Sequence, residues 1–244
     1  MGASFTARDL EVRYGDVVAL SEVDLDIAGP SALAVIGPNG CGKSTLLGAI
    51  AGIVAPSAGS VASSSPPALV LQSTDIDRSL PITVRDTVGM ARYPRLGLLR
   101  RPAPEDRRAV EDAMERLGVA DLAGRQLHDL SGGQRQRVFV AQGLAQRTDI
   151  LLLDEPLSGV DLVSRELILE ALDAERDAGR IVVTTTHNFD DARRADRILL
   201  LATRPIAIGP PSVVLTDVHL QQAFGGRFLR LGERLLLDDP HHPH

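Results

Sequence analysis

The chain has 244 residues, of which 44% are hydrophobic and 24% charged, so it can bury one substantial core, with room for a smaller subdomain. Its formal net charge of −6 disfavours a nucleic-acid surface, and we expect no nucleic-acid partner. The single cysteine excludes an internal disulfide, the first residues lack the apolar stretch of a signal peptide, and no apolar run is long enough for a membrane helix. We therefore expect a cytosolic chain that reaches a membrane only through a partner subunit.

Short runs of alternating apolar and polar residues fill positions 5–27, for example Val23-Asp24-Leu25-Asp26-Ile27. This alternation is typical of antiparallel strands that keep one face in solvent. The sequence therefore predicts an N-terminal antiparallel β-subdomain.

A phosphate-binding loop follows. Residues 32–36 form an unbroken apolar run of the buried-strand type, and the helical pattern of residues 46–50 can end at Gly52. Between them the sequence fills every position of the pattern G-x-x-x-x-G-K-[ST], whose backbone N–H groups and helix dipole surround phosphate oxygens. We expect the N-terminal strands to cover this nucleotide site from one side. The expected nucleotide-binding residues are Gly37, Pro38, Asn39, Gly40, Cys41, Gly42, Lys43, Ser44 and Thr45.

Lys43 and Ser44 carry the chemistry of the loop. The Lys43 ammonium is expected to reach the β- and γ-phosphates, and the Ser44 hydroxyl is expected to ligate Mg²⁺. Lys43 is the only lysine among the 26 Lys and Arg residues, which favours a position that a broad guanidinium would not fit. Cys41 permits a redox-switch interpretation, but a small side chain that fills a loop position is the favoured one.

The stretch after the loop predicts first turns and then helices. Residues 52–67 are rich in Gly, Ser, Ala and Pro and predict a loop with at most short strands, before a core strand that ends at Gln72. A helical subdomain is expected over residues 82–126, with Thr83 as an N-cap and an amphipathic surface helix. Residues 90–101 combine leucines with arginines, so a contact surface and a solvated loop are both open.

Residues 130–137 closely resemble the signature motif of ATP-binding cassette (ABC) ATPases. Ser131 can cap a helix whose N-terminal amides form a second phosphate site, and Gly132 and Gly133 allow close approach to it. Gln134 belongs to the same motif. Because one chain keeps this site far from its own phosphate-binding loop, the resemblance implies a head-to-tail homodimer that sandwiches two ATP molecules.

The other motifs of ABC ATPases follow in order. An apolar strand resembles Walker B, which would deliver Asp154 to Mg²⁺ and Glu155 to the attacking water. Asp161 lies in a segment that resembles the D-loop of the dimer interface and can also start the next helix. His187 follows another apolar strand and matches the switch histidine that contacts the γ-phosphate.

Two earlier residues gain a role from this resemblance. Gln72 matches the Q-loop glutamine, which links the metal ion and the water to a transmembrane partner. Tyr14 matches the aromatic residue that stacks on adenine, although a lone tyrosine in a strand is more often a packing residue.

The resemblance covers residues 14–224 and implies an α/β fold: a P-loop NTPase core with a mostly parallel sheet, an antiparallel β-subdomain and a helical subdomain. We assign residues 5–225 to an ABC ATPase domain and residues 226–244 to a C-terminal extension. Three departures from the family pattern lie outside the phosphate chemistry: Leu71 in place of proline, Gln142 in place of arginine, and a short segment between Gly59 and Ala68.

Within the superfamily, residues 83–94, 141–146, 158–161 and 214–225 are similar to segments of the ATPase subunits of manganese, zinc and iron importers. This likeness implies an ATP-hydrolysing subunit at the inner face of the cell membrane, with an integral-membrane permease and an extracytoplasmic solute-binding protein as partners. Two alternatives remain: a soluble ABC ATPase that acts on a macromolecule, and an importer of a non-metal solute.

The last residues, 238–244, hold two carboxylates and three of the six histidines. Imidazoles and carboxylates ligate Zn²⁺ and similar ions, which suggests a weak metal sensor or buffer. A terminal tail held extended by Pro240 and Pro243 equally suits adventitious metal binding, so both interpretations stay open.

Overall fold

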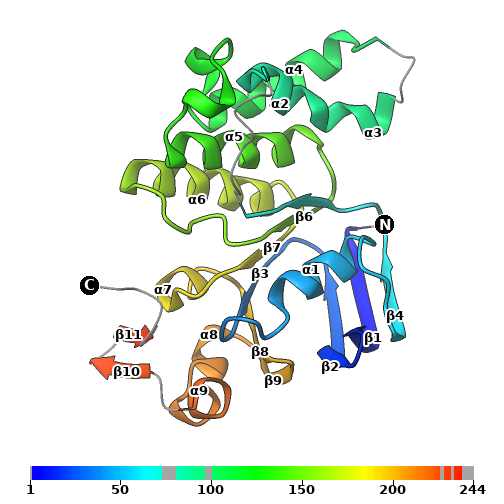
Figure 1. Cartoon of the computed structure of the whole chain (residues 1–244), viewed down its shortest axis with the longest axis vertical. Helices are drawn as coiled ribbons and strands as arrows, with labels where there is room; N and C mark the ends of the chain where they lie inside the picture. The colour runs from blue at the N-terminus through cyan, green and yellow to red at the C-terminus, as the bar shows by residue number, and fades with distance from the viewer. Residues whose placement is uncertain (1, 73–80, 97–100, 226–227, 232–233, 238–244) are drawn as a thin grey trace.

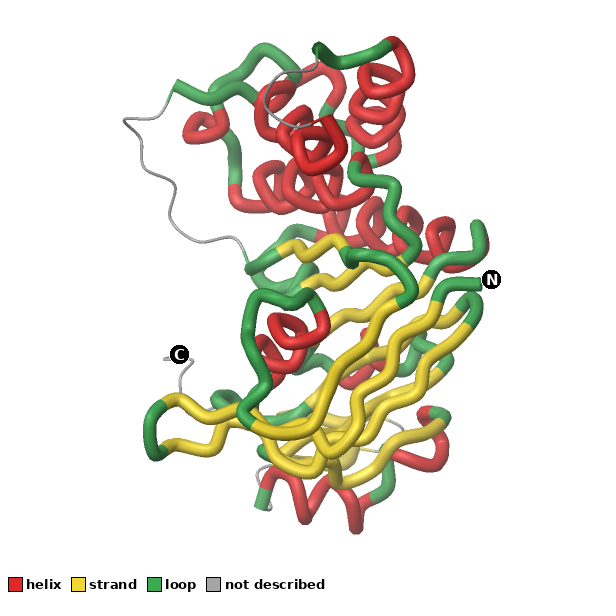
Figure 2. The backbone as a smooth tube through the Cα atoms, turned by 90° about the vertical axis from the view of Figure 1, so that its right-hand side faces the viewer, coloured by secondary structure: helices red, strands yellow, loops and turns green. Residues whose placement is uncertain are grey.

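The structure is a computed structural model that describes residues 2–72, 81–96, 101–225, 228–231 and 234–237. Strands occupy the middle of the molecule, most helices gather at one end, and short helices pack at the opposite end (Figures 1 and 2). None of the helices within these residues combines the length and apolar character that a bilayer crossing needs. The His-rich segment 238–244 lies outside the described residues.

A six-stranded sheet forms the centre of the molecule. Its strands are β3 (Ser31–Ile36), β5 (Ala68–Val70), β6 (Ile150–Leu153), β7 (Ile181–Thr185), β8 (Arg197–Ala202) and β9 (Arg204–Gly209). They lie in the order β5-β6-β7-β3-β8-β9, and all neighbours pair in parallel except β8 with β9. The mostly parallel core sheet predicted from the sequence is confirmed.

A second sheet is antiparallel. It consists of β1 (Ser4–Tyr14), β2 (Val17–Ala28) and β4 (Ala58–Ser63), in the order β2-β1-β4. The alternating apolar residues of β1 and β2 are buried on one face, as the sequence pattern requires. The predicted antiparallel β-subdomain is therefore confirmed, and the turn-rich stretch after the phosphate-binding loop adds one strand to it.

The helices fall into three groups. α1 (Lys43–Ile50) directly follows the phosphate-binding loop. The helical end of the molecule contains α2 (Val84–Gly89), η1 (Met90–Arg92), α3 (Tyr93–Leu96), α4 (Pro104–Arg116), η2 (Ala120–Leu122), η3 (Leu127–Asp129), α5 (Gly132–Ala145) and the adjoining α6 (Leu162–Asp177). The remaining elements are α7 (Phe189–Ala192), α8 (Pro211–Val214), α9 (Asp217–Phe224) and the hairpin of β10 (Phe228–Leu231) and β11 (Arg234–Leu237).

Side-chain caps fix where three of these helices begin. Thr83 Oγ1 accepts the Asp86 N–H at 3.1 Å, Ser131 Oγ accepts the Gln134 N–H at 3.2 Å, and Asp161 Oδ1 accepts the Ser164 N–H at 2.9 Å. Each bond satisfies an N–H group that has no partner inside its helix. All three caps match the sequence-based predictions.

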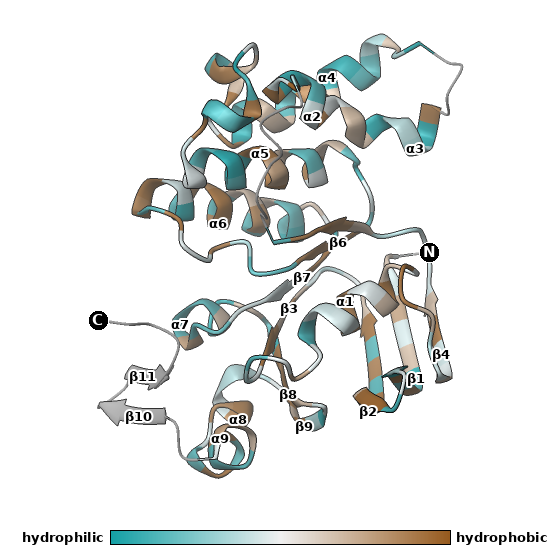
Figure 3. Cartoon of the chain, in the orientation of Figure 1, coloured by the Kyte–Doolittle hydropathy of each residue, from teal (hydrophilic) through white to brown (hydrophobic). Residues whose placement is uncertain are grey.

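Apolar side chains are concentrated on the core sheet, whose strands are mostly brown in Figure 3. Every residue of β6 is buried, because a parallel strand covered on both faces has no solvent-facing side. Within the described residues, three hydrophobic clusters meet at the sheet. One is shared with α4, α5 and α6, the second with α1 and the antiparallel sheet, and the third with α7, α8 and α9. The sheet therefore joins the helical end to the antiparallel end.

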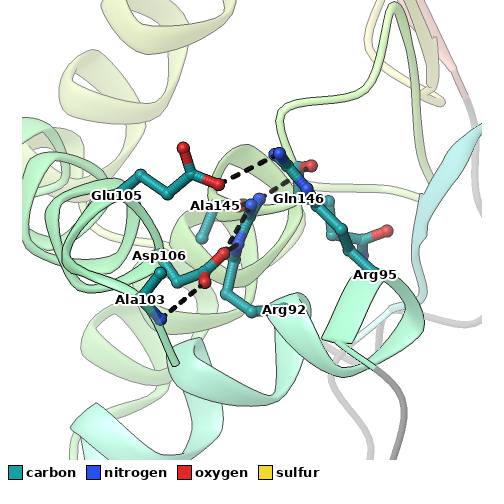
Figure 4. Close-up of polar contacts among 7 residues, drawn as sticks. All are labelled: Arg92, Arg95, Ala103, Glu105, Asp106, Ala145 and Gln146. Carbon is teal, nitrogen blue, oxygen red and sulfur yellow. Dashed lines mark hydrogen bonds and ion pairs between the residues drawn. The ribbon is translucent and has the colours of Figure 1, made fainter. Parts of the chain in front are cut away.

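A buried arginine fastens the segment after α2 to α5. The Arg92 side chain is 3% exposed, its Nε donates to Asp106 Oδ1 at 2.9 Å, and its Nη1 donates to the Ala145 carbonyl at 2.8 Å (Figure 4). The hydrogen bond from Arg92 holds the pKa of the Asp106 carboxyl below its ordinary value. Residues 90–96 are helical, with Ala91 and Arg92 buried, whereas residues 97–100 lie outside the described residues, so a contact surface and a solvated segment both stay open for the stretch as a whole.

Arg92→Met would leave the buried Asp106 carboxylate without its cation, so we expect the Tm to fall by about 5 °C or more. Arg95 provides a matched control, since it pairs with Glu105 at 3.0 Å while its side chain is 64% exposed. Arg95→Met should shift the Tm by less than about 1 °C, because exposed ion pairs contribute little. Thermal unfolding followed by circular dichroism measures both variants, and equal shifts would contradict the importance of the buried pair.

Candidate active site

The carboxyl ends of four parallel strands meet at one edge of the core sheet. The strand register sets Val35 of β3 beside Thr185 of β7, and Leu153 of β6 beside Thr184. Ligands of open α/β sheets bind at such an edge. The residues brought there from the ends of β3, β5, β6 and β7 are the loop 37–42, Gln72, Asp154 with Glu155, and His187.

The phosphate-binding loop closes around Lys43. The ammonium is buried, and its Nζ donates to the carbonyl oxygens of Gly37 at 2.9 Å and Pro38 at 3.1 Å. Gly42 has a left-handed backbone with φ 99°, and a Cβ there would lie 2.4 Å from the Ala19 carbonyl oxygen of β2. The N-terminal strands therefore lie directly against the loop, in agreement with the sequence-based expectation.

Cys41 is packed inside this loop. Its side chain is buried, and burial raises the pKa of the thiol above its ordinary value despite the neighbouring Lys43 ammonium. Because the thiolate is the reactive form of cysteine, a raised pKa lowers the reactivity at neutral pH. This environment favours a space-filling side chain over a redox switch.

Two adjacent carboxylates follow β6. Asp154 is buried, and its Oδ1 accepts a hydrogen bond from the Thr185 hydroxyl at 2.6 Å. Glu155 donates its backbone N–H to the same hydroxyl at 2.8 Å. The Glu155 carboxylate faces His187, with 3.6 Å between Oε2 and the imidazole Nδ1. Thr185 was not predicted from the sequence, where it is one of three consecutive threonines.

The Glu155 carboxyl has a lowered pKa. The contact with His187 is the main cause, and the charges of His187 and Lys43 act in the same direction, while burial opposes them. Glu155 is therefore ionised at neutral pH. An ionised carboxylate at this position can accept a proton or orient a water molecule.

The signature segment packs against the D-loop segment of the same chain. Gly133 is buried, and a Cβ there would lie 2.3 Å from Asp161 Oδ2 and 2.6 Å from Ser164 Oγ. The Asp161 carboxylate accepts both the N–H and the hydroxyl of Ser164, at 2.9 and 2.7 Å. These bonds hold the pKa of Asp161 below its ordinary value. In this structure its carboxylate acts as a helix cap.

Some of the remaining predicted site residues are exposed, whereas Pro38, Thr45 and Gln134 are half-buried. Ser44 lies in the first turn of α1, Gln72 follows β5, and Ser131 and Gly132 begin the signature helix α5. Tyr14 ends β1 with 54% of its surface exposed, so its ring face is accessible rather than packed in the core.

Residues 20–158 match the family model described as ABC transporter. The chain belongs to this family. As an ABC ATPase it binds and hydrolyses ATP, and the hydrolysis is coupled to transport.

Relatives of this ABC ATPase act in metal transport systems. The manganese transport system ATP-binding protein MntB of Listeria innocua is 39% identical over 225 residues, which cover 88% of this chain and 94% of the relative. The zinc transport system ATP-binding protein TroB of Treponema pallidum is 37% identical over 228 residues, covering 90% and 86% of the two chains. Among solved structures, an inward-facing transporter assigned to the metal-chelate type has a TM-score of 0.83 and 28% identity, with 96% of each chain covered.

Gly133→Ala should destabilise this ABC ATPase, because the added methyl group displaces the carboxylate that caps α6. Loss of such a cap corresponds to a fall in Tm of about 3 °C. Gly132→Ala is the matched control, since a Cβ at that position meets nothing within 4 Å. Alanine also suits a helix better than glycine, so the control should not lower the Tm. Differential scanning calorimetry compares the two, and similar transitions would contradict the packing argument.

Proposed function

We propose that this chain is the ATPase subunit of an importer for a divalent transition metal, manganese or zinc. The observation that carries the catalytic part is the convergence of Lys43, the Asp154–Glu155 pair and His187 at one edge of the core sheet. The manganese and zinc relatives, similar over most of their length, support the choice of substrate class. Hydrolysis by this site supplies the free energy that moves the metal across the membrane.

A Mg²⁺ ion fits the donor set at this edge. The Ser44 hydroxyl is exposed at the start of α1, and Asp154 has only its Oδ1 engaged by Thr185 among the described residues. The Gln72 amide adds a third oxygen, and such hard oxygen donors suit Mg²⁺. Bound there, the ion would offset the negative charge of the phosphates.

The protein residues have separate roles in binding the phosphates and in activating the water. Lys43 binds the β- and γ-phosphates, Glu155 orients the attacking water and accepts its proton, and His187 contacts the γ-phosphate. The exposed Ser131 and Gly132 at the N-terminus of α5 support a second phosphate contact made to the nucleotide of a partner copy. The active form is a homodimer that encloses two ATP molecules.

An integral-membrane permease is the proposed partner at the inner face of the membrane, together with an extracytoplasmic solute-binding protein. Three large apolar side chains support such a contact surface. They lie on the two segments that flank residues 73–80: Leu71 is 61% exposed, Met90 39% and Tyr93 59%. Met90 and Tyr93 lie three positions apart in adjoining helical segments, where neighbouring exposed apolar side chains favour a protein contact.

Glu155→Gln should leave ATP binding intact and slow hydrolysis by about two orders of magnitude or more, because the amide cannot accept the proton. ATP turnover at saturating nucleotide measures the loss, and size-exclusion chromatography with ATP should show a trapped dimer. Glu170→Gln, the same change at an exposed position of α6, is the control and should turn over ATP at the parent rate. Parent-like turnover by Glu155→Gln would remove Glu155 from the mechanism.

The substrate class is tested in proteoliposomes that contain this ATPase and the permease of its own system. Solute-binding protein loaded with Mn²⁺ or Zn²⁺ should stimulate ATP hydrolysis, whereas the metal-free form should not. Stimulation by a non-metal solute instead would contradict the metal assignment. Stimulation by DNA or ribosomes without the permease would favour a soluble ATPase that acts on a macromolecule.

A further inference from the structure

The Thr185 hydroxyl joins the two carboxylate residues of the site. It donates to Asp154 Oδ1 at 2.6 Å and accepts the Glu155 N–H at 2.8 Å. Thr185 is the last residue of β7 and is fully buried, so water does not compete for either bond. The Thr185 side chain thus binds Asp154 through its carboxylate and Glu155 through its backbone N–H.

The direction of both hydrogen bonds is fixed by chemistry. An ionised carboxylate only accepts and a backbone N–H only donates, so the single hydroxyl proton must point to Asp154. Without Thr185, the Asp154 oxygen and the Glu155 N–H would each lose a hydrogen-bond partner in a buried environment. An unsatisfied buried polar group costs more free energy than an ordinary exposed hydrogen bond contributes. The Thr185 hydroxyl therefore has a single orientation that satisfies both hydrogen bonds.

Both carboxylate residues gain a defined position from this arrangement. Engagement of Oδ1 leaves the other Asp154 oxygen for a ligand. Glu155 has a left-handed backbone with φ 46°, which is unfavourable for a residue with a side chain and persists only where surrounding contacts hold it. Its N–H bond to Thr185 is such a contact, and it helps direct the Glu155 side chain toward His187.

We propose that Thr185 is a positioning residue for ATP hydrolysis, which sets the Asp154 carboxylate and the Glu155 backbone relative to each other through one hydroxyl. This inference rests on the roles proposed above for Asp154 and Glu155. In this proposed role, Thr185 contacts neither the nucleotide nor the attacking water. It acts through its two neighbours, and small displacements of catalytic groups cost large factors in rate.

Thr185→Val tests the hydroxyl at nearly constant side-chain shape. We expect kcat to fall about tenfold or more while KM for ATP changes less than about threefold, because the loop that binds the phosphates is untouched. Thr185→Ser keeps the hydroxyl and should recover most of kcat. Thr184→Val makes the same change one residue earlier, on the opposite face of the strand, and should leave kcat at the parent value.

A second readout does not depend on turnover. Hydrogen exchange of the Glu155 backbone amide, measured by NMR without nucleotide or metal, should be faster in Thr185→Val than in the parent, Thr185→Ser and Thr184→Val. Should the valine variant fail to fold, Thr185→Ser and Thr185→Ala form a second pair that differs only in the hydroxyl. The same differences in kcat and amide exchange are then expected between serine and alanine.

Parent-like kcat in Thr185→Val, an equal loss of kcat in the serine and valine variants, or unchanged amide exchange at Glu155 would each overturn the proposal. Failure of this inference is distinct from failure of the proposed catalytic role. Parent-like turnover by Glu155→Gln would remove that role and leave the amide exchange result standing. An inactive Glu155→Gln beside a fully active Thr185→Val would remove only the positioning role.

Discussion

Parallel pairing of β6, β7 and β3 is the constraint on which the site depends. Because β7 lies between the other two strands, its end reaches both the carboxylates after β6 and the loop after β3. Thr185 contacts Asp154 and Glu155 on one side, and the Thr186 N–H donates to the Val35 carbonyl at 3.1 Å on the other. A shift of one residue in this register would turn the Thr185 hydroxyl to the opposite face of the sheet.

The helix α5 links two distant parts of the molecule. Fourteen residues make a rod of about 21 Å. At its N-terminal end Gly133 packs on the cap of α6, and at its C-terminal end the Ala145 carbonyl accepts a hydrogen bond from Arg92. Both contacts are buried, so α5 is held at its two ends by the segment that carries Arg92 and by the cap of α6.

Features that depend on neighbours in sequence were predictable, and features that depend on register were not. The caps at Thr83, Ser131 and Asp161 involve a residue three positions ahead, and each is visible in the sequence. The phosphate-binding loop and the apolar strands were recognisable for the same local reason. In contrast, the bond from Thr185 to Asp154 spans 31 positions, and the sequence alone does not tell which of three consecutive threonines meets the carboxylate. Arg92 was missed likewise, since its partner depends on how α4 packs.

The threonine in β7 also shows how stability and catalysis constrain one another. A buried hydroxyl in an apolar strand is unfavourable by about 1–3 kcal/mol unless it has a partner, and a buried carboxylate without a partner costs more. Thr185 and Asp154 each supply the partner that the other lacks. Replacing Thr185 by valine would relieve only the hydroxyl and would leave the carboxylate and the Glu155 N–H unsatisfied. The same two bonds therefore stabilise the end of β7 and hold the two carboxylate residues in place.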